Sequence, residues 1–224
     1  MELRTATPDD ADAIGAIFRA TIGLGAPLAF EVPRGYQELC LGWYLDRGRS
    51  DVALVVDDDR AVGYALVCTD EADHQRWVIG AAARFVVRSM PAAFNPRSPT
   101  RAAFVRSRWR DGLRLRQSGA PVAPAHAHVN LLPDHRAGRV GRLLVHHVDA
   151  VVARAGLPSW YAEINSRRGR RAAALTRFGA EIVHREPNLT LSRLLGEPVE
   201  RLTALRRLDE ARPMFGGLAA PGRT

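Results

Sequence analysis

The stretch that decides the fold runs from His126 to Gly156 and reads HAHVNLLPDHRAGRVGRLLVHHVDAVVARAG. Residues 126–132 alternate between polar and apolar side chains, which is the period of a half-buried β-strand. Pro133 ends this strand because it has no N–H to donate to a neighbouring strand. The following apolar residues recur at helical spacing and predict an amphipathic helix, which Gly156 ends in the left-handed conformation: Leu144, Val148, Val151, Val152 and Ala155.

A basic turn joins this strand to this helix. The N-terminus of a helix presents unpaired N–H groups and a partial positive charge. Gly138 and Gly141 leave room for a ligand to approach the backbone, and Arg136, Arg139 and Arg142 add positive charge. The turn is therefore predicted to bind a phosphate-bearing ligand.

The same stretch resembles the acetyl-CoA signature of the GNAT acyltransferase superfamily. In that family, a strand ending near a proline is followed by Arg/Gln-x-x-Gly-x-Gly/Ala and two leucines in a helix. Arg136, Gly141, Leu143 and Leu144 match, whereas Arg139 stands where the family usually has its first glycine. The segment from Pro124 to Pro133 also resembles the acetyltransferase-like domain of bacterial relatives of O-GlcNAcases.

Other segments resemble further parts of the GNAT fold. Residues 1–11 look like the first strand running into a helix that Thr7 caps, and residues 51–69 look like the second and third strands. Residues 160–165, 170–178 and 188–195 are expected to be a strand, a helix and a last strand. The resemblance implies an α/β fold with a mixed, mostly antiparallel central sheet, flanked by helices, in one domain over residues 1–212. Residues 213–224, rich in Gly and Pro, are expected to form a flexible tail.

Residues 70–122 interrupt the family pattern after the third strand. Residues 73–90 and 100–117 each have a helical pattern, with Pro91, Pro96 and Pro99 between them. Nine arginines fall in residues 84–116, against the single acid Asp111. The insertion is either a helical pair packed on the domain edge, a lid over the acyl-acceptor site, or a surface for nucleic acid. The sequence has no helix-turn-helix or zinc pattern, which argues against nucleic acid.

Composition narrows the class of protein. Apolar residues make up 46% of the 224 residues, as in globular domains, and no apolar run is long enough to span a bilayer. The N-terminus lacks a signal-peptide pattern, so we expect a cytoplasmic protein. Cys40 and Cys68 are too few for a disulfide framework. All 32 basic residues are arginines, and the net charge of +8 favours polyanions or acidic protein surfaces.

The GNAT resemblance implies acetyl-CoA, or another acyl-CoA, as co-substrate. Its pantetheine arm would lie along the 126–132 strand, and an N–H near Leu132 would polarise the thioester carbonyl. Its pyrophosphate would rest on the N–H groups of residues 137–142. The residues expected to bind it are Leu131, Leu132, Arg136, Ala137, Gly138, Arg139, Val140, Gly141, Arg142 and Asn165.

Acyl transfer to an amine needs a base that accepts a proton. His126 and His128 share one face of the signature strand, and Glu163 follows on the next strand near Tyr161. The family's usual acid, a tyrosine, is replaced by Leu175. A His-x-His pair can also bind a metal, but no third ligand stands at a telling spacing, so no metal is expected.

These features predict an acyl-CoA-dependent N-acyltransferase that modifies a small-molecule amine by direct attack. Two alternatives stay open. The acyl donor is carried by an acidic acyl carrier protein that docks on the basic insertion, or the domain binds coenzyme A or a partner without catalysis. No membrane partner is expected, and the sequence leaves a homodimer open.

Overall fold

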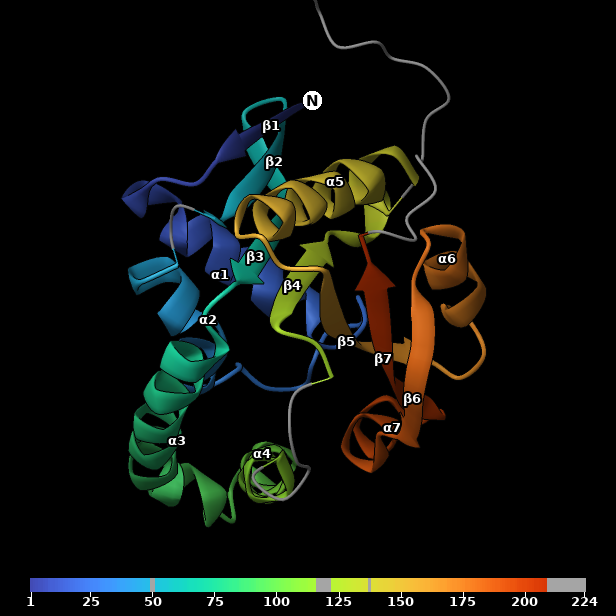
Figure 1. The fold of residues 1–224 in the computed structure, drawn as a ribbon. Helices are drawn as coiled ribbons and strands as arrows, with labels where there is room; N and C mark the ends of the chain where they lie inside the picture. The colour runs from blue at the N-terminus through green and yellow to red at the C-terminus, as the bar shows by residue number, and fades with distance from the viewer. Residues whose placement is uncertain (49–50, 116–121, 137, 209–224) are drawn as a thin grey trace, which may run out of the picture.

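The computed structural model describes residues 1–48, 51–115, 122–136 and 138–208. Helices cover both faces of one sheet (Figure 1). In chain order the elements are β1 (Glu2–Thr5), η1 (Pro8–Asp10), α1 (Ala11–Thr21), α2 (Arg34–Asp46), β2 (Ala53–Asp57), β3 (Arg60–Cys68), α3 (Glu71–Ala93), α4 (Pro99–Leu115), β4 (Ala125–Leu131), η3 (Pro133–His135), α5 (Gly138–Arg154), β5 (Ser159–Arg167), α6 (Ala172–Arg177), β6 (Glu181–Pro187), α7 (Leu189–Leu195) and β7 (Val199–Arg207).

The sheet has the strand order β1-β2-β3-β4-β5-β7-β6. Every neighbouring pair is antiparallel except β4 and β5, which are parallel. This confirms the predicted mixed, mostly antiparallel sheet. The two parallel strands pair only where they begin, at Ala125 with Trp160 and at His126 with Tyr161. Beyond these pairs β4 and β5 separate, so the sheet has an opening in its middle.

Two apolar cores lie on opposite faces of the sheet. On one face Leu144, Val148, Val151 and Val152 of α5 are buried against β2, β3, β4 and β5, as the helical spacing predicted. Ala155 was expected on the same face, but it follows the last residue of α5 and is exposed. On the other face Ile14 and Phe18 of α1 are buried with α2 and with the alternate residues of β3. Because β3 is buried on both sides, it is a continuous apolar strand with hardly any polar residue.

The helical insertion predicted after the third strand consists of α3 and α4. Figure 1 shows both helices beyond the N-terminal end of β4. Pro91 lies inside α3 rather than between the helices as expected, and the break falls after Ala93. Phe85 and Phe104 are buried between the two helices. No helix within residues 1–48, 51–115, 122–136 and 138–208 is long and apolar enough to cross a membrane.

Some arginines of the insertion point inward. The Arg108 side chain is 9% exposed, pairs with Asp111 at 2.7 Å, and lies over the rings of Tyr36 and Phe104. Arg106 donates to the carbonyl oxygen of Ala93. These two arginines therefore hold the insertion together and are not available to an external partner.

The expected last strand over residues 188–195 is wrong, because this segment is the helix α7. The Asn188 side chain accepts a hydrogen bond from the N–H of Leu191 and caps the helix, and Gly196 ends it with a φ of 69°. The last strand is β7, which runs between β5 and β6. The predicted tail, residues 213–224, lies outside the described residues, and the single-domain boundary at 212 stays a prediction.

Candidate functional site

The opening between β4 and β5 exposes main-chain groups in the middle of the sheet. The N–H of Leu132 donates to the carbonyl of Val62 at 2.9 Å, in antiparallel register with β3. In such a ladder alternate residues turn away from the paired strand, so beyond the last β4–β5 pair the main-chain groups of Val129 and Leu131 face the opening. The N–H of Leu132, expected to polarise a thioester, is therefore already bonded. Leu131 is the residue beside it whose N–H faces the opening.

The N-terminus of α5 lies at the wide end of this opening. The helix begins at Gly138, so the predicted glycine-containing turn is the first turn of the helix. The N–H groups of Gly138, Arg139 and Val140 have no acceptor inside the helix. A Cβ atom on Gly141 would lie 3.6 Å from Phe178 and 3.9 Å from Leu131, so this glycine faces inward.

Three arginines from different elements converge near the same end of the opening. Arg136 follows β4, Arg167 ends β5, and Arg171 precedes α6. Burial lowers the pKa of the Arg171 guanidinium, and the charges of Arg136 and Arg167 lower it further. Burial and then the charge of Arg167 lower the pKa of Arg136. Arg167 is already paired with Glu197 at 2.6 Å, whereas the like charges near the partly buried Arg171 favour an anion beside it.

The other residues expected to bind a cofactor are placed differently. Arg139 and Arg142 are exposed on the first turn of α5. The side-chain oxygen of Asn165, on β5, accepts a 2.8 Å hydrogen bond from Asn188. Ala137 lies outside the described residues.

His128 lies on the face of β4 opposite α5. Its ring stands 6.3 Å from that of Phe18 and 6.1 Å from that of Tyr64. Its Nδ1 atom is buried and has no hydrogen-bond partner among the described residues. Burial, and then the nearby His126, lower the pKa of His128 to about 4. The imidazole is therefore neutral near pH 7 and has a nitrogen to offer.

His126, on the same face, has a partner at both ring nitrogens. Its Nδ1 lies 2.6 Å from an oxygen of Glu71, and its Nε2 lies 2.5 Å from the Tyr44 hydroxyl. The Tyr161 ring of β5 stands 5.6 Å away. Glu163 is exposed two residues further along β5, on the same face as Tyr161. The structure thus brings the predicted histidines beside Tyr161, where β4 and β5 begin to part.

Solved structures share this arrangement of strands and helices. One described as SsHAT has a TM-score of 0.63 at 20% identity, over 92% of this chain and 98% of that one. The Drosophila melanogaster polyamine N-acetyltransferase, which forms N-acetylagmatine, has a TM-score of 0.58 at 11% identity, over 92% and 99%. The protein yncA from Salmonella typhimurium, solved with acetyl-CoA, has a TM-score of 0.54 at 16% identity, over 100% and 99%.

The chain has the GNAT fold. Nearly the whole of each chain takes part in the likeness, which confirms the predicted resemblance at the level of fold. No family model matches the sequence. The narrower resemblance to relatives of O-GlcNAcases stays a prediction.

The helix that follows β5 in this GNAT fold is α6. Leu175, at the place of the family's usual tyrosine, lies within it and is partly buried. Tyr161 on β5 is instead the tyrosine near the predicted histidines. Burial, with the charges of Glu71 and Glu163, raises the pKa of the Tyr161 hydroxyl well above its usual value, so it stays protonated and can donate.

Two functional candidates near β4 were missed from the sequence: Glu71 and His74, both on the first turns of α3. With Cys68 they form the spacing Cys-x-x-Glu-x-x-His, which places Glu71 and His74 on one helix face. This spacing could have indicated a cluster of side chains that bind a common partner. It is hard to recognise in the sequence because it spans the end of a strand and the start of the insertion.

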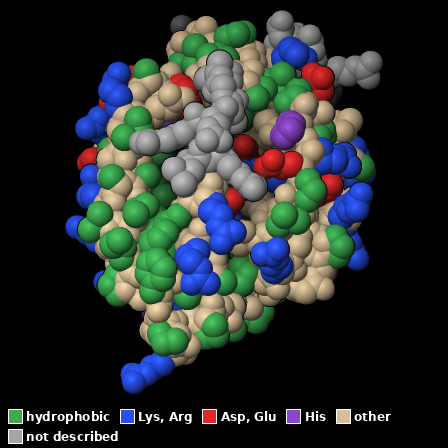
Figure 2. All heavy atoms as spheres, turned by 90° about the horizontal axis from the view of Figure 1, so that it is seen from below, with side chains coloured by type: hydrophobic (Ala, Val, Ile, Leu, Met, Phe, Trp, Pro, Cys, Tyr) green, Lys and Arg blue, Asp and Glu red, His purple; other side chains and the backbone are tan. Residues whose placement is uncertain are grey.

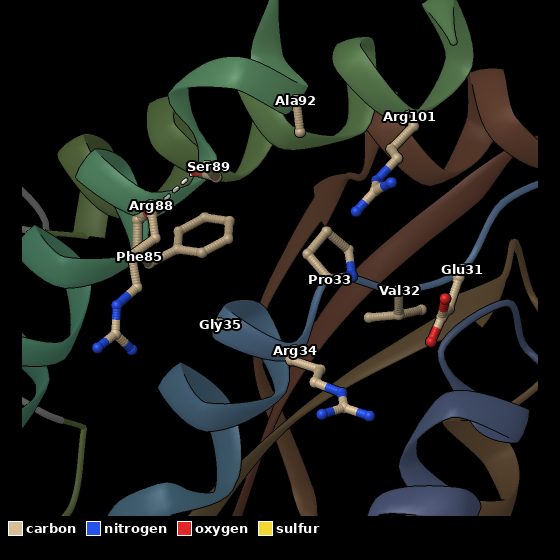
Figure 3. Close-up of a pocket in the computed structure, with 10 residues that line it drawn as sticks. All are labelled: Glu31, Val32, Pro33, Arg34, Gly35, Phe85, Arg88, Ser89, Ala92 and Arg101. Atoms are coloured by element: carbon tan, nitrogen blue, oxygen red, sulfur yellow. Dashed lines mark hydrogen bonds between the residues drawn. The ribbon is translucent and has the colours of Figure 1, made fainter. Parts of the chain in front are cut away.

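A cavity of about 400 Å³ lies between the start of α2 and the two insertion helices (Figure 3). In Figure 3 Arg101 reaches from α4 toward Pro33, and Phe85 and Ser89 project from α3. None of its lining residues belongs to β4 or β5. The cavity is therefore distinct from the opening in the GNAT sheet.

Figure 2 shows one face of the molecule, seen from the side on which the insertion lies. Arginine side chains are spread over this face with apolar side chains between them. Several outward arginines are paired: Arg88 lies 3.4 Å and Arg84 3.7 Å from Glu38. This distribution fits a solvated helical surface.

Proposed function

We propose that the protein transfers the acyl group of acetyl-CoA, or of another acyl-CoA, to a small-molecule amine. One observation carries this proposal: β4 and β5 part beside the N-terminus of a helix, and three arginines surround the wide end of the gap. A ligand with an extended polar arm and a polyanionic end fits this arrangement. Acyl-CoA has that form.

The two ends of the opening would bind the two ends of this ligand. The N–H groups of Gly138 to Val140 and the guanidinium groups of Arg136 and Arg171 would hold its phosphates. The main-chain groups of Leu131, nearest the phosphates, would hold the pantetheine amide, as a neighbouring strand would. The N–H of Val129, nearer the narrow end, would then donate to the thioester carbonyl and stabilise the oxyanion that forms there.

The narrow end of the opening holds groups that suit acyl transfer. The amine nitrogen attacks the thioester carbon, and the neutral His128 accepts the amine proton, directly or through water. When the tetrahedral intermediate collapses, the C–S bond breaks and the sulfur keeps the electron pair. Tyr161 then protonates the thiolate, or coenzyme A leaves as the anion. Glu163, exposed nearby, would attract a cationic amine.

The comparisons support the amine as acceptor. The Drosophila protein is a polyamine N-acetyltransferase, and another structure of similar fold, with a TM-score of 0.56 at 12% identity, is an agmatine N-acetyltransferase. Both descriptions name aliphatic amines. We extend the class, rather than either compound, to this chain.

Calorimetric titration of acetyl-CoA and coenzyme A into wild type and Gly141→Glu tests the donor site. Gly141 faces Phe178 and Leu131 at the wide end, so a glutamate there adds bulk and negative charge beside the proposed phosphate position. We expect micromolar binding to wild type and a loss of at least about 100-fold in the variant, since about 2.8 kcal/mol of repulsion suffices.

Gly80→Glu is the matched control, because it makes the same change within α3, away from the opening. It should bind acetyl-CoA as wild type does. Failure of wild type to bind acetyl-CoA and coenzyme A would overturn the proposal, and equal loss in both variants would show that the effect is not local.

A further inference from the structure

We propose that Cys68, Glu71, His74 and His126 form a binding site for one Zn²⁺ ion. One ligand atom from each residue lies within 4.8 Å of all the others. The cluster lies beside the narrow end of the opening, and none of its four residues is assigned a role in the proposed acyl transfer apart from His126, which the sequence offered as a base. Its occupation does not depend on the proposed acyl transfer.

Three elements bring these residues together. Cys68 ends β3 and is the register partner of His126 on β4, so the two side chains are direct neighbours across the strands. Glu71 and His74 lie three residues apart on α3, which places them on one face of the helix. The helix begins immediately after β3, so this face turns back over the strand pair.

The hydrogen bonds around the four residues leave metal-binding atoms directed toward the centre of the cluster. The Tyr44 hydroxyl binds Nε2 of His126 and leaves its Nδ1 facing Glu71. Metal-binding histidines commonly have such a partner on their other nitrogen, which fixes the ring. The Nδ1 of His74 is buried without a hydrogen-bond partner among the described residues, 4.0 Å from Glu71. Buried nitrogens are usually bonded to a protein group, a water or an ion, so a bound ion would account for this one.

The ring of His74 is fixed by its aromatic surroundings. It stands edge-on at 5.3 Å from the Trp43 ring and 4.6 Å from that of His126. Trp43 in turn donates a 2.8 Å hydrogen bond to Asp73. The two imidazoles are therefore held beside each other by packing, and no described residue makes a hydrogen bond to the Nδ1 of His74.

The donors suit Zn²⁺ in type and in charge. Two imidazole nitrogens, a thiolate and a carboxylate make a tetrahedral set for this ion, whereas Mg²⁺ and Ca²⁺ prefer oxygen. On binding, the S–H bond of Cys68 breaks, the proton passes to solvent, and a Zn–S bond forms. The thiolate and the Glu71 carboxylate then balance both charges of the ion.

Only small movements are required. In a tetrahedral zinc site neighbouring ligand atoms lie about 3.4 Å apart, as follows from Zn–N bonds of about 2.1 Å. Glu71 and His126, now 2.6 Å apart, would separate slightly as the ion replaces the proton between them. The neutral imidazole then carries its proton on Nε2, which donates to the Tyr44 hydroxyl, and any further proton passes to solvent. The side chains of Glu71 and His74 are each 17% exposed, so an ion can enter from solvent.

The ion would fasten the insertion to the sheet. It would link the first turns of α3 to the end of β3 and the start of β4, beside the point where β4 and β5 part. With His126 committed as a ligand, His128 is the histidine of the pair that remains for proton transfer.

Zn²⁺ uptake by the full chain tests the site. Protein stripped with chelator is dialysed against Zn²⁺, the bound metal is counted by atomic spectrometry, and affinity is measured with a chelating indicator. We expect one tightly bound equivalent in wild type. His74→Gln should lose affinity by more than the roughly 100-fold that weaker, indirect changes around a metal cause.

His184→Gln is the matched control, because His184 on β6 is exposed and lies 3.8 Å from Glu186, another histidine beside a carboxylate. It should keep the wild-type equivalent. Circular dichroism of the stripped proteins shows whether each variant is folded before metal is added.

Co²⁺ in place of Zn²⁺ reports on the ligands. Wild type should give the intense visible bands of tetrahedral cobalt and a thiolate-to-cobalt band in the near ultraviolet, and Cys68→Ser should lose the second. Absence of a stoichiometric equivalent in wild type, equal uptake by folded His74→Gln, or a thiolate band that persists in Cys68→Ser would each overturn the site and leave a network of hydrogen bonds only.

Discussion

Asp10 receives more hydrogen bonds than most carboxylates near a surface. Its oxygens accept from both terminal nitrogens of Arg4, at 2.7 and 2.8 Å, and from the N–H and hydroxyl of Thr7, at 2.7 and 2.9 Å. The hydrogen bond from Arg4 is the main reason that the pKa of Asp10 lies far below its usual value. The residue joins β1 to the start of α1.

Asp10→Asn is therefore expected to lower the free energy of unfolding by about 2 kcal/mol at pH 7, because charge-assisted hydrogen bonds are lost. The folded pKa lies below the unfolded value of about 3.9, so the carboxylate stabilises the fold above that pH and loses this effect as pH falls. Urea denaturation of wild type and variant at several pH values measures the difference.

The exposed neighbour Asp9 provides the comparison for this prediction. Asp9→Asn should change stability by no more than about 0.5 kcal/mol, the effect of one charge near a helix N-terminus. A difference between wild type and Asp10→Asn that stays constant down to pH 2.5 would contradict the argument.

His128→Ala is expected to lower kcat by about 10²–10⁴-fold if the residue is the base of the proposed transfer. Binding of acetyl-CoA should change little, because the His128 side chain lies on the face away from α5. Steady-state kinetics with an aliphatic amine and calorimetry with acetyl-CoA separate the two effects. An unchanged kcat would remove His128 from the mechanism.

For single residues, the sequence predicted which side chains of β4 share a face but not which residues they contact. Alternation along β4 was enough to predict that His126 and His128 share a face. Their partners could not be found in the same way, because Glu71 and Tyr44 are 55 and 82 positions from His126. The return of α3 over β3 and β4 brings Glu71 to His126, and the packing of α2 on the same face of the sheet brings Tyr44.

Among the elements, two helix ends differ in what surrounds their final glycine. Gly156, after α5, has a φ of 71° and open space where a Cβ would stand. Gly179, after α6, has a φ of 75°, and a Cβ there would lie 2.5 Å from a terminal nitrogen of Arg206. Arg206 cannot easily move, because it is buried and binds Asp149 through two nitrogens.

We therefore expect Gly156→Ala to cost about 1 kcal/mol, the strain of a left-handed alanine. Gly179→Ala should cost at least about 3 kcal/mol, because it also disturbs a buried ion pair. Thermal unfolding of the two variants under identical conditions measures the order. Equal losses would show that Arg206 relaxes without cost.

The elements also show where sequence patterns mislead. The GNAT resemblance placed a strand at residues 188–195, where Leu189 and Leu191 alternate with polar residues. The same segment has an asparagine at its start and Gly196 at its end, which are helix signals. These end signals were correct, since a short segment fits both periods and its capping residues distinguish them.

For the whole molecule, the insertion depends on one buried arginine. Arg108 pairs with Asp111 and lies over two aromatic rings, and Asp111 is also 3.9 Å from Arg201 of β7. Arg108→Ala is expected to lower the free energy of unfolding by about 3 kcal/mol, because packing and a partly buried pair are lost together. Arg110 is exposed and lies two residues further along α4, so Arg110→Ala should change the free energy of unfolding by less than about 0.5 kcal/mol.

Denaturant unfolding, followed by tryptophan fluorescence, tests this difference, since Trp109 lies between the two positions. If both variants were equally stable, the insertion would not contribute to the cooperative fold. The position of the insertion in the chain was predictable from its composition. Its packing on α2 and α7 was not, because those contacts join apolar residues with no local pattern in common.

The short pairing of β4 with β5 has a consequence for the molecule without ligand. Beyond Ala127 and as far as Leu131, β4 has an edge inside its own sheet, where the described residues place no strand beside its main-chain donors and acceptors. Strand edges of this kind recruit any extended chain, including that of another copy. Protein without ligand should therefore aggregate more readily on storage than protein with ligand. A molecule that lies along β4 should prevent this by covering the strand edge.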